Sequence, residues 1–168
     1  MPRPSRHAPG GLVFHVLNRA VGKRNLFEKE GDFQAFEKVL LETLHILPMR
    51  VCGYCLMPNH WHFILWPEHD GDLARFMQRL TNTHVKRWKE HRHEIGYAQL
   101  YQGRYKSFPI QTNDYFYQAV RYVERNALRA NLAPLGLGPV WAVKGVKIFR
   151  PTYFLRGPCR VPRTGGNG

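Results

Sequence analysis

Residues 50–66 carry the stretch RVCGYCLMPNHWHFILW, and this stretch decides the fold that the sequence predicts. Two runs of aromatic and aliphatic residues, 50–57 and 60–66, flank the dipeptide Pro58-Asn59. Proline and asparagine favour turns, whereas aromatic and β-branched residues favour strands. The stretch therefore predicts an antiparallel hairpin that turns at Pro58-Asn59.

The segments around this hairpin predict two helices and an earlier strand. Apolar alternation over residues 12–17 indicates a strand that ends at Asn18-Arg19. Apolar residues recur every three or four positions from Asp32 to Leu47, and Pro48 then prevents the helix from continuing. A second stripe of this kind consists of Leu73, Phe76, Met77, Leu80, His84 and Trp88.

Further elements are expected in the second half of the chain. Gly96 should end the second helix, residues 104–111 indicate a strand, and Thr112 or Asn113 should cap a last helix. One more strand is expected near residues 147–149. The order strand, helix, strand, strand, helix, strand, helix predicts an α+β protein, with helices packed on a ferredoxin-like, or RRM-like, antiparallel sheet.

Composition limits the class of protein. The 168 residues include 25 Lys and Arg against 12 Asp and Glu, a net charge of +13, so a polyanion such as nucleic acid is the expected partner. The length fits one domain, residues 1–155, followed by a disordered tail at 156–168. Three cysteines, no apolar leader in residues 1–11 and no membrane-length apolar run lead us to expect a cytoplasmic protein.

Two histidines at the start of the second hairpin strand are candidates for chemistry. Side chains alternate along a strand, so His60 and His62 project from the same face. Their Cα atoms are then roughly 7 Å apart. Two imidazoles at this spacing can converge on one cation, or on a phosphate, and leave room for a further ligand.

The predicted last helix supplies partners for this pair. Tyr122 and Asn126 are four residues apart and share one helical face, about 6 Å apart along the axis. Asn126 offers an amide oxygen as a third ligand, and Tyr122 offers a phenol beside it. The arginines at 121, 125 and 129 follow a neighbouring stripe that suits phosphate oxygens. Alternatively, Tyr122 covers the edge of the core and the arginines only contact solvent.

Two stretches of the sequence resemble a known family. They are CLMPNHWHFIL at residues 55–65 and RYVERNALRA at residues 121–130. With PGG at 9–11, HVLNR at 15–19, LF at 26–27 and QGRYKS at 102–107, they resemble the REP-associated tyrosine transposases. These are single-tyrosine members of the HUH nuclease and transposase superfamily, and the similarity runs in order from about residue 6 to 134.

The chain departs from the family pattern at three places. Ala127 stands where proline is common, Asn131 where glycine is common, and Trp141-Ala142-Val143-Lys144 replaces a usual Trp-Ser-Ser ending. The first two departures leave the candidate ligands intact. The third concerns the C-terminal quarter and any contacts that it makes with DNA.

The resemblance implies an HUH nuclease fold and a covalent reaction. Tyr122 would attack a DNA phosphodiester, leaving a free 3′ hydroxyl and a 5′ phosphotyrosine link that a second hydroxyl can resolve. A divalent metal on His60, His62 and Asn126 would assist, because phenols are poor nucleophiles at neutral pH. Imidazole ligands alone favour Mn²⁺ or Zn²⁺, whereas the resemblance indicates Mg²⁺ or Mn²⁺.

The resemblance also implies a DNA substrate that folds as a hairpin, a short imperfect palindrome with a flanking single strand. The protein would act as a monomer or a homodimer and would not involve a membrane. Charge and position in the matching segments select six candidates for DNA contacts, namely Asn18, Arg19, Arg24, Arg104, Lys106 and Arg125.

Two other interpretations fit parts of the sequence. The first is a non-catalytic RRM-like module whose aromatic residues stack on bases. The second is a structural zinc site on Cys52, Cys55, His60 and His62. We disfavour zinc because Cys52 and Cys55 would point to opposite faces of a regular strand, and because the spacing lacks the long separation between ligand pairs of zinc fingers.

Overall fold

The computed structural model describes residues 8–22, 24–96, 99–110, 115, 118–119, 121–122, 140–143 and 146–149. Their helices and strands are β1 (Val13–Arg19), α1 (Glu30–Ile46), β2 (Arg50–Met57), β3 (His60–Trp66), α2 (Asp72–Arg92), β4 (Lys106–Ile110), β5 (Val140–Val143) and β6 (Val146–Phe149). Residues 115, 118–119 and 121–122 also have helical backbone.

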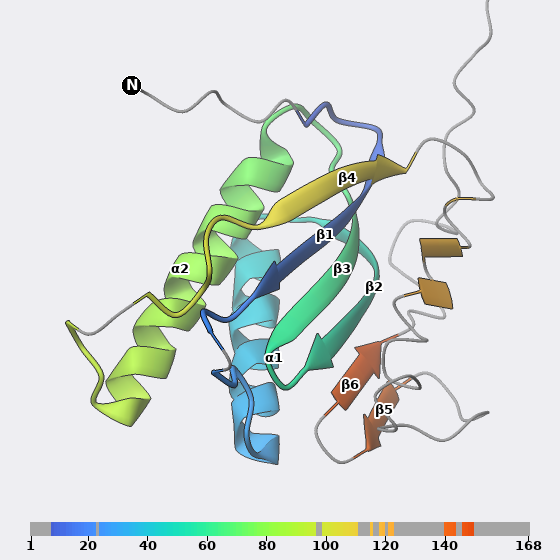
Figure 1. The fold of residues 1–168 in the computed structure, drawn as a ribbon. Coiled ribbons are helices and arrows are strands. Elements are labelled where there is room, and N and C mark those ends of the chain that lie inside the picture. Colours follow the sequence, from blue (N-terminus) through green and yellow to red (C-terminus); the bar gives the residue numbers. More distant parts are fainter. Residues whose placement is uncertain are drawn as a thin grey trace, which may run out of the picture.

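The strands form one antiparallel sheet in the order β4-β1-β3-β2-β6-β5. Four of these strands, in the order β4-β1-β3-β2, form the ferredoxin-like arrangement that the sequence predicts. Helix α1 connects β1 to β2, and α2 lies between β3 and β4 in the chain. Both helices lie against the same face of the sheet (Figure 1). Residues on the other face of β1 and β3 therefore lie away from α1 and α2.

The hairpin of β2 and β3 is the centre of this sheet, and its predicted bounds are confirmed. Met57 pairs with His60 across the Pro58-Asn59 turn, and Cys55 pairs with His62. The register shifts between Val51 and Gly53, which makes Cys52 the extra residue of a β-bulge. This bulge breaks strict alternation in the first half of β2.

Apolar side chains between the sheet and the two helices form the core. Phe36 of α1 contacts the rings of Trp61 and Phe63 of β3, at centroid distances of 6.4 and 6.2 Å. The residues of α2 that are buried are those of the predicted stripe: Leu73, Phe76, Met77, Leu80, His84 and Trp88. The spacing of apolar residues therefore identified correctly which side of α2 faces the sheet.

A buried polar cluster attaches the segment before β4 to this core. Trp61 Nε1 donates a hydrogen bond to the Tyr101 hydroxyl (2.9 Å), which in turn donates to His84 Nδ1 (2.6 Å). Burial lowers the pKa of His84 to about 3, so the ring is neutral, and Nδ1 accepts this hydrogen bond when the ring proton is on Nε2. Tyr101 also pairs with Ala20 in an isolated bridge, which holds residues 99–105 beside the end of β1.

The ends of several elements differ from the sequence-based expectation. Helix α1 begins before Asp32, because the Asp32 carboxylate accepts hydrogen bonds from the backbone N–H groups of Glu28 and Lys29. Helix α2 ends at Arg92, before Gly96, since His93 adopts a left-handed conformation (φ 55°). The expected cap at Thr112 or Asn113 lies outside the described residues.

The C-terminal part contains more strand than expected. The strand predicted near residues 147–149 is β6, and β5 precedes it as its hairpin partner. The expected tail, residues 156–168, lies outside the described residues. No helix within the described part of the chain is long and apolar enough to cross a membrane.

Candidate active site

His60 and His62 lie on the same face of β3, as the sequence predicts, and this face is turned away from the helices. Their neighbours Trp61 and Phe63 belong to the core, and alternation places the two histidines opposite. The ring centroids are 5.1 Å apart, with the planes nearly perpendicular at 86°. His62 is buried, with 4% of its surface exposed, and His60 is half-buried.

The ring of His60 has a defined partner on one nitrogen. Its Nδ1 lies 2.7 Å from Asn59 Oδ1, and because that oxygen only accepts, Nδ1 is the donor. Burial lowers the pKa of His60, and the neighbouring charge of Arg19 lowers it further, so the ring is neutral at neutral pH. A neutral His60 with a proton on Nδ1 leaves its Nε2 lone pair available to a ligand.

His15 of β1 is a third histidine at this place, which the sequence analysis did not nominate. Its Nε2 lies 3.0 Å from His62 Nδ1, and the two rings stack at 5.2 Å. Burial lowers the pKa of His62 to about 3, with smaller contributions from His15 and His60. The alternation of β1 could have indicated His15, because it is a polar residue on the face opposite Phe14 and Val16.

Tyr122 lies beside these histidines. Its ring is edge-on to that of His62 (centroids 5.8 Å apart, 90°) and to that of His15 (5.9 Å, 73°). It is also 44% exposed, so a substrate can reach the hydroxyl. The structure thus brings together two residues, His62 and Tyr122, that are far apart in sequence. Asn126 and Arg125, also predicted for this site, lie outside the described residues.

Exposed cations border the site at the end of β1. Arg19 pairs in register with His60, and Leu17 pairs with His62. A hollow of about 270 Å³ is lined by Leu17 and by three cationic residues, Arg19, Arg104 and Lys106. The three cationic residues are exposed. Three of the predicted DNA-contact residues therefore lie close together, next to the histidine pair.

The other two described candidates make contacts within the protein. Arg24 forms an ion pair with Glu94 (2.7 Å) and lies over the Trp88 ring, 5.4 Å from its centroid. Asn18 is buried, donates to the Gly103 carbonyl (3.2 Å) and accepts from the Arg19 backbone N–H (2.9 Å). Both residues thus help to hold the segments that surround the site.

The two imidazoles suit a metal site with open positions better than a closed structural zinc site. When His62 Nδ1 donates to His15 Nε2, both His60 and His62 are neutral and present Nε2, as metal ligands must. The zinc alternative is wrong, since no three His, Cys, Asp or Glu side chains among the described residues could hold an ion together. The expectation that Cys52 and Cys55 point to opposite faces is also wrong, because the bulge at Cys52 breaks the alternation of a regular strand.

Comparisons with known proteins agree with this fold. The family model described as IS200-like transposase matches residues 10–126. Among solved structures, the chain is similar to a REP-associated tyrosine transposase bound to a REP hairpin, with a TM-score of 0.59 and 19% sequence identity. That similarity covers 77% of this chain and 74% of the other. No curated protein matches the sequence.

Proposed function

Because the chain belongs to the IS200-like transposase family, we propose that it cleaves and rejoins single-stranded or hairpin DNA through a covalent link to Tyr122. One observation carries this proposal. The exposed ring of Tyr122 lies within 6 Å, centroid to centroid, of both His62 (5.8 Å) and His15 (5.9 Å). An exposed phenol beside imidazoles that could hold a metal suits a tyrosine nucleophile, because metal coordination is one way to activate such a group.

The reaction is a transesterification that needs no external energy source. The Tyr122 oxygen forms a bond to phosphorus, the bond between phosphorus and the 3′ oxygen breaks, and the phenolic proton is lost to solvent or to the leaving oxygen. The product is a 5′ phosphotyrosine and a free 3′ hydroxyl. Attack by a second 3′ hydroxyl reverses these steps and rejoins DNA.

A divalent metal, Mg²⁺ or Mn²⁺, is the proposed cofactor. His60 and His62 would hold it through Nε2, with Asn126 as the third ligand. The metal would supply Lewis-acid stabilisation of charge on the phosphate oxygens. The hydrogen bond from His60 Nδ1 to Asn59 and the contact between His62 Nδ1 and His15 fix the orientation of the two imidazoles.

Arg19, Arg104 and Lys106 are the residues that we propose contact the DNA backbone. They are exposed and border the hollow beside the histidine pair. The similar solved structure holds a REP hairpin, and a hairpin with an unpaired flank is accordingly the substrate that we propose here. If about six phosphates are neutralised, the affinity should fall with salt along a log-log slope of roughly −4 to −5.

Tyr122→Phe tests the proposal, and Tyr115→Phe is its matched control. Both residues have helical backbone and are exposed, Tyr122 by 44% and Tyr115 by 64%. Single-stranded and hairpin oligonucleotides from the flanks of the gene are incubated with Mn²⁺ and analysed by denaturing electrophoresis. Wild-type protein and Tyr115→Phe should form a covalent adduct, whereas Tyr122→Phe should bind the DNA and form none.

Two results would contradict the proposal. Unchanged cleavage by Tyr122→Phe would show that another group is the nucleophile. Tight binding without an adduct for every variant, wild type included, would favour the non-catalytic module, in which an exposed aromatic residue such as Phe108 stacks on bases.

A further inference from the structure

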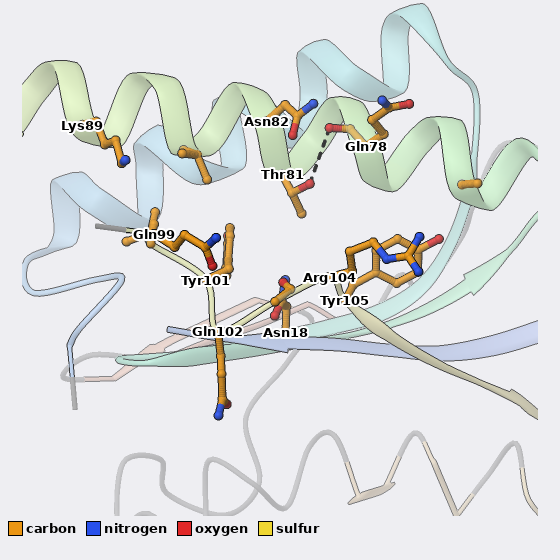
Figure 2. Close-up of a pocket in the computed structure, with 14 residues that line it drawn as sticks. Asn18, Gln78, Thr81, Asn82, Lys89, Gln99, Tyr101, Gln102, Arg104 and Tyr105 are labelled. Carbon is orange, nitrogen blue, oxygen red and sulfur yellow. Dashed lines mark hydrogen bonds between the residues drawn. The ribbon is translucent and has the colours of Figure 1, made fainter. Parts of the chain in front are cut away.

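A large cavity lies between α2 and residues 99–105, on the helix side of the sheet (Figure 2). It has a volume of about 880 Å³, which is in the range of small-ligand pockets. Gln78, Asn82 and Lys89 line it from α2, and Gln99 and Arg104 line it from the opposite segment. The cavity is thus bordered by α2 on one side and by residues 99–105 on the other, and residues 102–104 of that segment also border the hollow beside the histidine pair.

The chemistry of the lining selects a class of ligand. None of the described residues that line the cavity is acidic, and Lys89 and Arg104 supply positive charge. The amides of Gln78, Asn82 and Gln99 offer both donors and acceptors, and the half-buried Tyr105 adds an aromatic surface. These groups together suit a nucleotide. The amides can recognise the edge of a base, the aromatic ring can stack on the base, and the cations can contact the phosphate.

The cavity is connected to the active site through the end of β1. The hollow beside the histidine pair, about 270 Å³, shares Asn18 and residues 102–104 with the larger cavity. Along β1 the side chain of Arg19 lies on the face of the histidines, and the adjacent Asn18 lies on the face of the cavity. The end of β1 therefore borders both the hollow beside the histidines and the cavity, so one DNA strand that contacts Arg19 can also reach the cavity.

We propose that this cavity binds one unpaired nucleotide from the flank of the DNA whose phosphodiester is cleaved at Tyr122. This inference rests on the proposed function and adds a second, separate site of base recognition to it. The amides of Gln78 and Asn82, one turn apart on α2, contact the base edge, and Arg104 contacts the phosphate. The cavity thereby sets which position of the flank enters the active site.

The test uses variants that keep the catalytic residues. Gln78→Ala and Asn82→Ala remove amides from exposed positions of α2, and Gln34→Ala removes one from an exposed position of α1 as the control. Two probes from the gene's flank are compared, a blunt hairpin and the same hairpin with an unpaired flank. Binding is measured by fluorescence anisotropy in EDTA, so that no cleavage occurs.

The proposal predicts a loss that depends on the flank. Gln78→Ala and Asn82→Ala should each weaken binding of the flanked hairpin by about 10-fold and leave binding of the blunt hairpin unchanged. An abasic nucleotide moved along the flank should weaken wild-type binding at one position, and at that position the variants should show no further loss. Equal losses for both probes, no effect of either variant, or no such position would overturn the proposal.

Failure of this inference can be distinguished from failure of the proposed function. The anisotropy measurement needs neither metal nor cleavage, whereas the adduct with Tyr122 needs both. A flank-dependent loss together with no wild-type adduct would support the cavity and refute the nuclease. A normal adduct with no flank-dependent loss would refute the cavity only.

Discussion

A substitution of His15 tests whether this residue orients the proposed metal ligand His62 without taking part in the reaction itself. His15→Phe keeps an aromatic ring on the sheet but removes the nitrogen that lies 3.0 Å from His62 Nδ1. Only 4% of His62 is exposed, so water cannot readily replace this partner. Loss of such a supporting hydrogen bond typically costs about 10- to 100-fold in metal affinity, or about 1.4–2.7 kcal/mol.

The assay measures metal binding and adduct formation separately. Free Mn²⁺ is followed by electron paramagnetic resonance, and the covalent adduct by denaturing electrophoresis across a Mn²⁺ titration. For His15→Phe both curves should shift to higher Mn²⁺ by the same factor, with adduct formation recovered at saturating metal. His15→Gln, whose amide can still accept from His62, should recover most of the affinity, and His45→Gln, at an exposed position of α1, should match wild type.

Two results would refute this reasoning. If His15→Phe bound Mn²⁺ as wild type does, the contact with His62 would not orient a ligand. If His15→Gln and His15→Phe lost affinity equally and both unfolded at lower temperature, His15 would contribute only packing.

Three further predictions concern the core and the face of the sheet. Tyr101→Phe leaves Trp61 Nε1 and His84 Nδ1 without a partner in the core and should lower the free energy of unfolding by about 2–4 kcal/mol. Urea denaturation measures this, and a loss below about 1 kcal/mol would contradict it. The pKa of His84 is 6.5 in the unfolded chain and about 3 in the folded protein. Its contribution to the free energy of unfolding should therefore be fully present above pH 6.5 and should decline as the pH falls toward 3. His84→Gln should reduce the slope of the free energy of unfolding against pH by about 1.4 kcal/mol per pH unit. Urea denaturation at several pH values measures this slope, and an unchanged slope would contradict a neutral His84. Phe108, 52% exposed and 6.4 Å from the His15 ring, should stack on a base. Phe108→Ala should weaken single-strand binding by about 5- to 100-fold and Phe108→Trp should not, whereas equal affinities in an anisotropy titration would exclude stacking.

The hairpin and the histidine pair could be predicted from the sequence because both depend on local rules. The Pro58-Asn59 turn is specified by its own residues, and alternation then places His60 and His62 on one face. The stripe of α2 was also predictable, since a helix exposes residues to its environment at a fixed period. Where the sequence alone specifies geometry in this way, the structure agrees with it.

Features that depend on a distant partner could not be predicted in the same way. The bulge at Cys52 arises from how β2 pairs with β3, and the residue types in β2 do not predict it. Arg24 looked like the other cations until the structure placed it against Glu94, seventy positions later in the chain. His15 became a site residue only because β1 pairs with β3, which brings it to His62.

Strand β1 shows why a single strand can serve two chemical surfaces. Its alternation places His15 and Arg19 on the face of the candidate active site and Asn18 on the face of the cavity. A slip of one residue in its pairing with β3 would exchange these sets and bring Phe14 into contact with the histidines. The apolar residues Phe14 and Val16 prevent such a slip, because they must remain in the core. The same burial that stabilises the fold therefore also fixes which polar residues of β1 face the candidate active site and which face the cavity.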